Sequence, residues 1–297
     1  MTDRIPAVSV VVPCYNGGRF IDRLLASLAA QTYRDFEIII VDDGSTDQFT
    51  TKKFASLPPS VRVLRQENLG LSGARNSGFR AARAGLVLPL DCDDTIEPTF
   101  LAETVPLLKA AAPDVGFVFT NVRLVGARTG IGELYFNPFD LLFGNQLVSC
   151  TLVRKSAWQA AGAYDETMCD GYEDWEFAIR IVRHGFRGVG VPKPLFNYLI
   201  SGDGMMMNRS SRMHGALWRQ IRIRHTESYR LPALLRLWWK TRQQPGKIRL
   251  PFALALLTMA NVLPETWFNG IIHRIRRIRI ARQRRRAEKT VLAPAKR

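Results

Sequence analysis

Cysteine is scarce in this sequence, and long apolar runs are absent. The four cysteines lie far apart and form no CxxC pair: Cys14, Cys92, Cys150 and Cys169. This spacing predicts neither a zinc site nor a disulfide framework. The apolar run after Asp3 and Arg4 is about five residues long, which is too short for the apolar region of a signal peptide. We therefore expect a protein of the reducing cytoplasm.

Acidic residues are almost absent from the last third of the chain. Residues 205–297 contain 22 Lys and Arg but three Asp and Glu, whereas residues 1–204 contain 20 and 23. The net charge of +16 therefore comes from a basic extension that follows a near-neutral body. The longest uncharged stretch of the extension, residues 250–264, has about fifteen residues, and a membrane-spanning helix needs about 20. With 46% hydrophobic residues, the 297-residue chain can bury a full core.

The first 120 residues alternate short β-branched runs with amphipathic stretches. Five apolar runs predict strands at residues 8–12, 36–41, 61–64, 86–90 and 115–119. Apolar residues at helical spacing predict helices around residues 20–28, 74–84 and 100–111. This alternation indicates βαβ units, so we expect an α/β fold with a mostly parallel sheet covered by helices on both faces.

Glycine motifs that hold phosphates are missing from the ends of these strands. No GxGxxG or GxxxxGK[ST] follows any of them, which argues against a dinucleotide-binding fold and a P-loop. Polar segments stand there instead, at residues 13–16, 42–47 and 91–94. Ligands of open α/β sheets bind at the carboxyl ends of strands, so these three segments form the candidate site.

Asp91, Asp93 and Asp94 place three carboxylates within four positions. Such a group would repel itself unless a cation neutralised it, and Mg²⁺ or Mn²⁺ prefers oxygen ligands. The alternative is an acidic turn in which Asp94 caps the next helix. The local sequence leaves both interpretations open.

Two further acidic pairs have a structural and a functional interpretation each. A turn with Asp47 as helix N-cap accounts for residues 45–47, but not for Asp42 and Asp43, whose carboxylates could accept hydrogen bonds from a nucleobase or ribose. Glu173 and Asp174 precede an amphipathic run, which predicts that they lie in the first turn of a helix ending near residue 185. These acids could stabilise the helix dipole or take part in catalysis.

Five motifs then occur together in a characteristic order: VSVVVPCYNGGRFI, EIIIVDDGSTD, NLGLSGARNSG, LPLDCDD and YEDWEF. They resemble the motifs of the inverting glycosyltransferases of family 2, and the similarity extends over residues 7–199. The resemblance implies a GT-A fold, a nucleotide-sugar donor and a bound Mn²⁺ or Mg²⁺ ion.

The resemblance also implies a set of donor-binding residues, with Asp43 on the base and the later aspartates of the D-x-D-D element on the ribose and the ion. The donor-binding residues would be Pro13, Tyr15, Asn16, Asp42, Asp43, Arg75, Asp91 and Asp93, and the metal ligands would be Asp93 and Asp94. Arg75 would reach the donor phosphates or the acidic cluster; the alternative is an arginine on a helix surface.

For catalysis, the resemblance implies that Asp174 is the general base on the acceptor hydroxyl, with Glu173 as the neighbour most easily confused with it. The Q-x-x-R-W element and the transmembrane helices of processive members are not found, which favours the addition of a single sugar. The four histidines are too scattered for a metal motif.

The basic extension allows several interpretations. From Trp267 onward, Phe268 and a series of isoleucines recur at helical spacing among arginines, as in helices that lie on an anionic membrane surface. The part between Trp218 and Trp239 could instead pack on the catalytic body, and residues 282–286 could be a solvated charge run. Nucleic-acid binding is the least favoured alternative.

We expect a GT-A domain at residues 1–204, with a nucleotide-sugar-binding half to residue 119 and an acceptor half to residue 204, followed by the basic extension at residues 205–297. The expected reaction transfers one sugar, with inversion, from a UDP- or dTDP-linked donor to a glycan or polyprenyl-linked glycan, in cell-surface polysaccharide assembly. The expected place is the cytoplasmic face of the membrane, and nothing indicates an oligomeric state. The alternatives are a nucleotidyltransferase that makes nucleotide-sugars, although PCYNGG is unlike its glycine-rich basic loop, and an inactive adaptor on the same fold.

Overall fold

The structure is a computed structural model that describes residues 4–200, 210, 213–272 and 274. All five predicted strands are confirmed within a nine-stranded sheet of order β3-β2-β1-β4-β8-β6-β9-β5, in which β7 pairs with β6. The strands are β1 (Val8–Cys14), β2 (Phe36–Asp43), β3 (Val61–Gln66), β4 (Leu86–Pro89), β5 (Thr95–Ile96), β6 (Val115–Gly126), β7 (Gly130–Gly132), β8 (Leu152–Arg154) and β9 (Arg187–Ile200).

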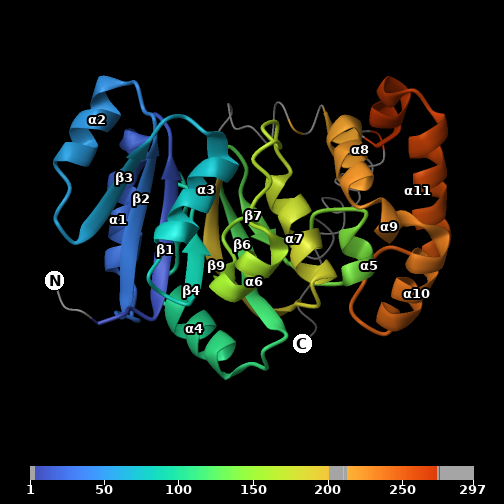
Figure 1. Cartoon of the computed structure of the whole chain (residues 1–297), viewed down its shortest axis with the longest axis horizontal. Coiled ribbons are helices and arrows are strands. Elements are labelled where there is room, and N and C mark those ends of the chain that lie inside the picture. The colour runs from blue at the N-terminus through green and yellow to red at the C-terminus, as the bar shows by residue number, and fades with distance from the viewer. Residues whose placement is uncertain (1–3, 201–209, 211–212, 273, 275–297) are drawn as a thin grey trace, which may run out of the picture.

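The sheet changes character along its width. The four strands β3, β2, β1 and β4 pair in parallel, as expected from their βαβ connections. Beyond them β8 is antiparallel to both β4 and β6, while β6 and β9 pair in parallel over a long register. The sheet is therefore parallel over β3, β2, β1 and β4, which lie within the half predicted to bind the nucleotide, and mixed beyond them (Figure 1).

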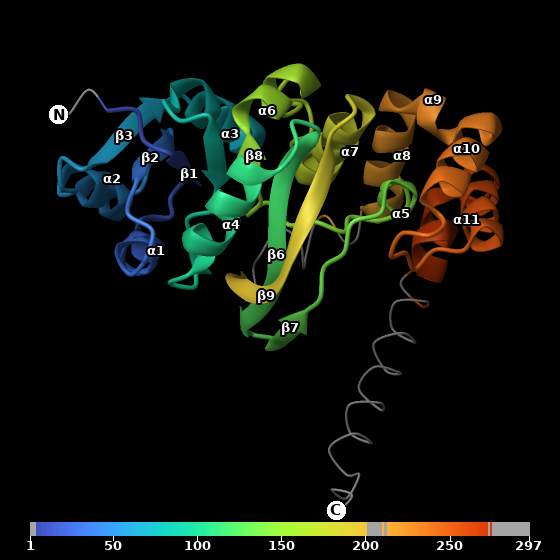
Figure 2. The ribbon, with the colours of Figure 1, turned by 90° about the horizontal axis from the view of Figure 1, so that it is seen from below.

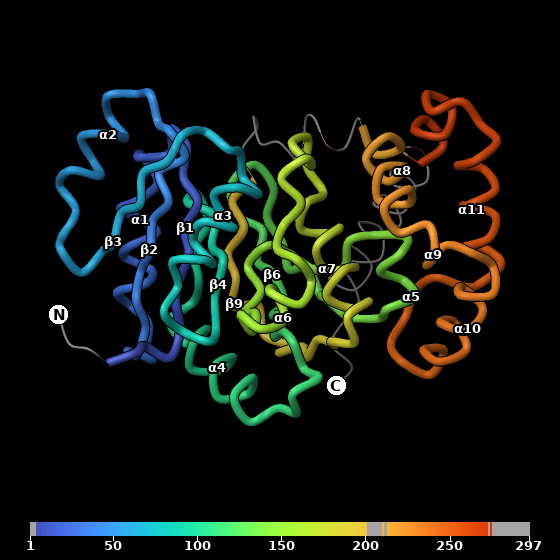
Figure 3. Tube along the Cα trace, viewed as in Figure 1, coloured from blue at the N-terminus to red at the C-terminus, as the bar shows by residue number. Residues whose placement is uncertain are grey.

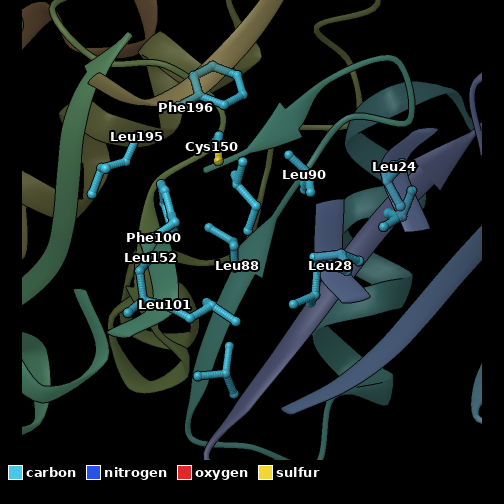
Figure 4. Packing of buried hydrophobic residues seen from close by; sticks show 14 of the residues in the cluster. Leu24, Leu28, Leu88, Leu90, Phe100, Leu101, Cys150, Leu152, Leu195 and Phe196 are labelled. Atoms are coloured by element: carbon cyan, nitrogen blue, oxygen red, sulfur yellow. The ribbon is translucent and has the colours of Figure 1, made fainter. Parts of the chain in front are cut away.

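Helices cover both faces of the sheet (Figure 2). They are α1 (Gly18–Ala29), α2 (Gln48–Ala55), α3 (Gly70–Ala81), α4 (Phe100–Ala110), α5 (Pro138–Leu141), α6 (Lys155–Ala161), α7 (Glu173–Arg183), α8 (His214–Arg224), α9 (Thr226–Tyr229), α10 (Leu231–Thr241) and α11 (Leu250–Val262). Helices α1 and α4 pack on one face, in a core cluster that includes Leu24, Leu28, Leu88 and Phe100 (Figure 4). Helices α3, α6 and α7 pack on the other face.

Helix α3 begins four residues before the predicted position and ends three residues earlier. Its sequence GLSGARNSGFRA is rich in small residues, so the helical signal is weak at its start. The small residues serve close packing: an ideal Cβ on Gly78 would lie 2.1 Å from Cγ1 of Val11 in β1. Because α3 lies this close to β1, its first turn stands at the carboxyl end of the parallel strands.

The C-terminal helices share a hydrophobic cluster with the body of the protein. Trp218 of α8 is 1% exposed and packs in one cluster with Phe139 of α5, Trp175 of α7 and residues of α10 and α11. Figure 3 shows α8 to α11 gathered at one end of the molecule beside α5 and α7. The packing interpretation therefore holds for most of the part from Trp218 to Trp239, since Leu234 and Trp238 of α10 also pack in this cluster. Trp239 itself and Trp267 are 62% and 69% exposed.

The expected boundary at residue 204/205 lies outside the described residues, as does most of the expected basic membrane helix, residues 275–297. In the described first turns of that helix, Phe268 and Ile272 are buried and belong to the hydrophobic cluster that α8, α10 and α11 share with α5 and α7. Among the residues that the structure describes, no helix combines the length and the apolar character that crossing a membrane requires.

Candidate active site

A cavity of about 490 Å³ opens at the carboxyl ends of β1, β2 and β4. Three segments that the sequence singled out meet there: the β1 loop from Pro13 to Gly17, Asp43 at the end of β2, and the turn from Asp91 to Asp93. The first turn of α3 and the loop before α7 complete its wall. Parallel strands bring their carboxyl ends to one edge of the sheet, which is why these distant segments converge.

Asn16 ties the β1 loop to the β2 loop. Its Oδ1 accepts hydrogen bonds from the backbone N–H groups of Thr46 (2.8 Å) and Asp47 (3.1 Å), and its own N–H donates to Ser45 Oγ. Asn16 adopts a left-handed backbone conformation, φ 52°, which asparagine tolerates better than most residues. Asp47 caps α2 by accepting a hydrogen bond from the N–H of Thr50, as predicted. Asn16 thus positions the loop that carries Tyr15, whose side chain is about half exposed at the cavity.

The two aspartates at the end of β2 have different surroundings. Asp43 lines the cavity, and its Oδ1 accepts hydrogen bonds from Gln66 Nε2 (2.7 Å) and the N–H of Leu69 (2.9 Å). Asp42 is buried and accepts the N–H of Ser45, so it closes the turn rather than facing the cavity. Successive side chains of a strand point to opposite faces, which explains the difference.

Arg75 connects the two acidic elements of the site. Its guanidinium donates from Nη1 to Glu173 Oε1 (2.7 Å) and from Nη2 to both carboxylate oxygens of Asp91 (2.8 and 3.1 Å). The side chain is 1% exposed, so the helix-surface alternative is wrong. Of the two roles implied by the resemblance, the geometry corresponds to the contact with the acidic cluster. A third residue, Ser149, donates to Asp91 Oδ2 at 3.0 Å.

Asp93 and Asp94 are separated by the turn that contains them. Asp93 lines the cavity, and burial followed by the charge of Asp91 raises its pKa. Asp94 is 1% exposed; its Oδ1 accepts the N–H of Leu199 (2.8 Å), and its Oδ2 has no described partner. The next α-helix, α4, has Thr99 at its N-cap, so the expectation that Asp94 caps it is wrong. The reason is that the short strand β5 intervenes and pairs with β9.

The acidic residues that line the cavity fit a divalent ion that is held only partly by the protein. In the described part of the chain, no three His, Cys, Asp or Glu side chains converge into a metal cage. A hard ion at Asp93 would therefore take its remaining oxygen ligands from a diphosphate and water, which is the ligand set that Mg²⁺ commonly uses. The raised pKa of Asp93 reflects a charge that such an ion would stabilise.

Glu173 and Asp174 begin α7, in the first helical turn as predicted. Glu173 lines the cavity, whereas Asp174 accepts a hydrogen bond at 3.1 Å from the amide of Asn145, which belongs to the loop before β8. Burial, and then the charge of Glu173, raises the pKa of Asp174 to about 7. A carboxylate with this pKa can accept a proton near neutral pH. Tyr172, at the N-cap, has a left-handed φ of 67°, so the helix starts from a strained residue at this site.

Sequence reasoning missed the side chains that position the acids. Ser149 and Asn145 bond Asp91 and Asp174, and the loop that carries Glu166, Met168 and Cys169 forms one wall of the cavity. These residues belong to irregular segments in which no periodicity or motif stands out. Only the first-turn position of the acidic pair indicated that the segment before α7 approaches the site.

Comparison with known proteins gives a consistent result. Residues 9–145 match the family model described as glycosyl transferase family 2. The sequence is 38% identical to EpsH of Bacillus subtilis over 42% of this chain and 36% of that protein. It is 28% identical to the amylovoran biosynthesis glycosyltransferase AmsB of Erwinia amylovora over 71% of this chain and 75% of AmsB. The aligned part spans only about a third or less of the length of the first curated relatives.

Solved structures show the same fold. TarS 1–349 of S. aureus in complex with UDP-GlcNAc superposes with a TM-score of 0.65 at 18% identity, covering 91% of each chain. The mannosyltransferase PcManGT of Pyrobaculum calidifontis, in complex with GDP-Man and Mn²⁺, gives a TM-score of 0.54 at 20% identity, covering 90% of this chain and 85% of that one. These two alignments cover 91% and 90% of this chain, so they extend into the part that contains α8 to α11.

Proposed function

Because this chain belongs to glycosyl transferase family 2, we propose that it transfers a single sugar, with inversion, from a nucleotide-sugar donor to a glycan hydroxyl. The observation that carries the proposal is the link from Asp91 through Arg75 to Glu173, which joins a cavity suited to a nucleotide to the acidic start of α7. AmsB is named for amylovoran biosynthesis, and this supports a place in cell-surface polysaccharide assembly.

The donor nucleotide would occupy the cavity between β1 and α3. Tyr15 offers an exposed aromatic face for the base, and Asp43 offers a carboxylate whose Oδ2 receives no hydrogen bond from the described residues. A carboxylate fixed in this way accepts a hydrogen bond from the N–H of a nucleobase. We propose a UDP- or dTDP-linked donor, and the bound UDP-GlcNAc of TarS supports the uridine alternative.

Asp93 would hold a Mn²⁺ or Mg²⁺ ion at the donor diphosphate. Asp94 would fix the position of the turn through the hydrogen bond that it accepts from the N–H of Leu199. When bound, such an ion supplies positive charge that stabilises the leaving nucleoside diphosphate. PcManGT, with its bound Mn²⁺, supports a divalent ion in this fold. Arg75 holds Asp91 in place with two hydrogen bonds, which leaves Asp93 as the carboxylate available on the cavity wall.

Asp174 would act as the general base. Its carboxylate takes the proton of the acceptor hydroxyl while that oxygen bonds to the anomeric carbon and the bond from this carbon to the diphosphate oxygen breaks. The amide of Asn145 holds one oxygen of Asp174 and orients the carboxylate. Glu173 cannot serve equally well, because its Oε1 is engaged by the buried guanidinium of Arg75.

A screen of nucleotide-sugars tests the proposal. UDP-, dTDP- and GDP-linked sugars are each added with and without Mn²⁺, and the midpoint of thermal unfolding is measured, since a ligand that binds the native state raises it. We expect a rise with a uridine or thymidine nucleotide-sugar that depends on Mn²⁺, followed by slow hydrolysis of the same donor. No stabilisation and no hydrolysis with any donor would refute the proposed function.

We further propose that the C-terminal helices bind an anionic membrane surface at the inner face of the cell membrane. A second cavity, of about 530 Å³, lies between α8, α9 and α11, and its lining includes Arg219, Arg222 and Arg230. Arg230 pairs with Glu227, but neither Arg219 nor Arg222 has a carboxylate partner among the described residues. Burial, and then the charge of Arg219, lowers the pKa of Arg222.

The cavity thus concentrates positive charge that an anionic lipid headgroup would neutralise, and exposed apolar side chains such as Trp267 and Val262 lie nearby in sequence. Co-sedimentation with vesicles that contain phosphatidylglycerol tests this. Each arginine near such a surface contributes about 1 kcal/mol, so Arg219→Gln should weaken binding about fivefold. Arg236→Gln is the matched control, because Arg236 is exposed on α10 and does not line the cavity. Equal binding by both variants and the unchanged protein would contradict the assignment of this cavity.

A further inference from the structure

Two cysteines from distant parts of the sequence meet in the donor cavity. Cys14 ends β1, and Cys92 lies in the turn after β4. The two strands pair in parallel with Val8 opposite Leu86 and Val11 opposite Pro89. Cys14 lies three residues beyond Val11 in β1, and Cys92 lies three residues beyond Pro89, in the turn that follows β4. Neighbouring strands lie about 4.8 Å apart, so this pairing places the two chain segments side by side just before both cysteines.

The sulfur atoms are close to each other. An ideal Cβ on Gly17 would lie 2.6 Å from Sγ of Cys92 and 2.9 Å from Sγ of Cys14, so the two sulfurs are at most about 5.5 Å apart. Gly17 leaves room for both sulfurs, since a Cβ at this position would overlap with each of them.

Both cysteines belong to the lining of the cavity; Cys92 is partly exposed there, whereas Cys14 is 2% exposed. The other two cysteines lie elsewhere, one in the core and one on a different wall of the cavity. Cys150 is 0% exposed within the main core cluster, and Cys169 lines the cavity from the loop before α7. A small oxidant that enters the cavity therefore meets the thiol of Cys92, with the buried thiol of Cys14 close to it.

We propose that Cys14 and Cys92 form a reversible disulfide modification site within the donor cavity, with hydrogen peroxide as the oxidant. One sulfur attacks the peroxide, the O–O bond breaks, and a sulfenic acid forms with release of water. The second thiol then attacks that sulfur, forming the S–S bond and releasing a second water. The two sulfurs together lose two electrons and two protons, and one peroxide becomes two waters.

The bond would fix the turn that carries Asp91 and Asp93 to the end of β1. Oxidation would then change the shape of the cavity at the wall where the donor is proposed to bind, and a dithiol reductant would restore it. The disulfide chemistry itself rests only on the two thiols, whereas its effect on transfer rests on the proposed function.

Peptide mapping after peroxide treatment tests the proposal, because trypsin places each cysteine in a separate peptide. Cys14 falls in residues 5–19, Cys92 in 84–109, Cys150 in 129–154 and Cys169 in 156–180. The full chain with Cys169→Ser is treated with hydrogen peroxide, free thiols are alkylated, and the peptides are weighed. We expect a cross-linked 5–19/84–109 species, about 2 Da lighter than the two reduced peptides, that dithiothreitol separates.

A second measurement uses the change in transfer on oxidation. Each variant is compared with its own untreated rate, and we expect the loss on peroxide treatment to match the cross-linked fraction and to disappear in Cys14→Ser and in Cys92→Ser. Sulfinic acid at either cysteine without a cross-link, or both thiols remaining free, would overturn the proposal. The mass measurement decides this even if the protein transfers no sugar, so failure of the disulfide and failure of the proposed function can be told apart.

Discussion

Replacing Asp174 by asparagine should abolish transfer and at the same time stabilise the protein. Loss of a general base typically lowers the rate about 10²–10⁴-fold. The change preserves the size of the side chain, and the amide of Asn145 can still donate to the oxygen that remains. Donor binding should therefore persist, because Asp174 does not line the donor cavity.

The gain in stability follows from the pKa of Asp174, which burial and the charge of Glu173 raise to about 7. In the unfolded chain an aspartate titrates near pH 3.9, so the native state binds more protons between about pH 4 and pH 7. The free energy of unfolding consequently falls as the pH rises through this window. A pKa that is about three pH units higher in the native state than in the unfolded chain corresponds to about 4 kcal/mol. This is the upper limit by which the ionised Asp174 lowers the free energy of unfolding above about pH 7.

Asp174→Asn removes this penalty. Its free energy of unfolding should match that of the unchanged protein near pH 4 and exceed it at pH 8, as measured by urea denaturation at both values. The rate of transfer by the unchanged protein should rise with pH through about 7, as the base loses its proton.

Glu173→Gln provides the contrast, because Glu173 accepts a hydrogen bond from the buried guanidinium of Arg75. Weakening a hydrogen bond to a charged group costs about 1.5–3 kcal/mol, so this variant should be less stable at pH 8. Near-normal transfer by Asp174→Asn would refute the role as base. A stability difference between Asp174→Asn and the unchanged protein that is the same at pH 4 and pH 8 would refute the reasoning about its charge.

Three further predictions concern the neighbouring charges. Asp93→Ala should abolish Mn²⁺-dependent binding of UDP, measured by calorimetric titration, while the melting transition remains cooperative. Arg75→Lys should lose about 3–5 kcal/mol of stability and most transfer, because one ammonium cannot bridge Asp91 and Glu173; denaturation and rate assays check this. Burial opposes ionisation of Glu176, but hydrogen bonds from a histidine and an arginine lower its pKa below the ordinary value. Glu176→Gln should therefore destabilise at pH 7, and the difference in urea denaturation should shrink as the pH falls below about 4.3, the pKa of an unfolded glutamate.

The sequence by itself determined the parallel half of the sheet and the three segments at its edge. Apolar runs of period and length suited to buried strands are a local property, and parallel strands necessarily bring their carboxyl ends together. The convergence of residues 13–16, Asp43 and Asp91 on one cavity could therefore be expected before any contact was known. The first-turn position of Glu173 and Asp174 also followed from local signals, since helix ends have their own residue preferences.

The tertiary structure decided which side chain of each acidic group has which surroundings. Adjacent aspartates cannot be told apart in a motif, but the pleat of the strand points Asp43 into the cavity and Asp42 into the turn. Asp94 is buried below the cavity instead, where it accepts a hydrogen bond from the N–H of Leu199 in β9. The ion pair of Arg75 with Glu173 joins positions 98 residues apart, so no local pattern could specify it.

The position of the basic extension was also undetermined by sequence. Its arginines and apolar residues suit a membrane surface and a protein surface equally, because both bury an apolar stripe. The packing of Trp218 with α5 and α7, and bonds such as those of His225 to Glu176 and Arg224 to Asp165, place α8 on the catalytic body, while Trp239 and Trp267 remain at the surface. Composition fixes how much apolar area a segment must bury, and the partner that buries it depends on which complementary surface the rest of the fold presents.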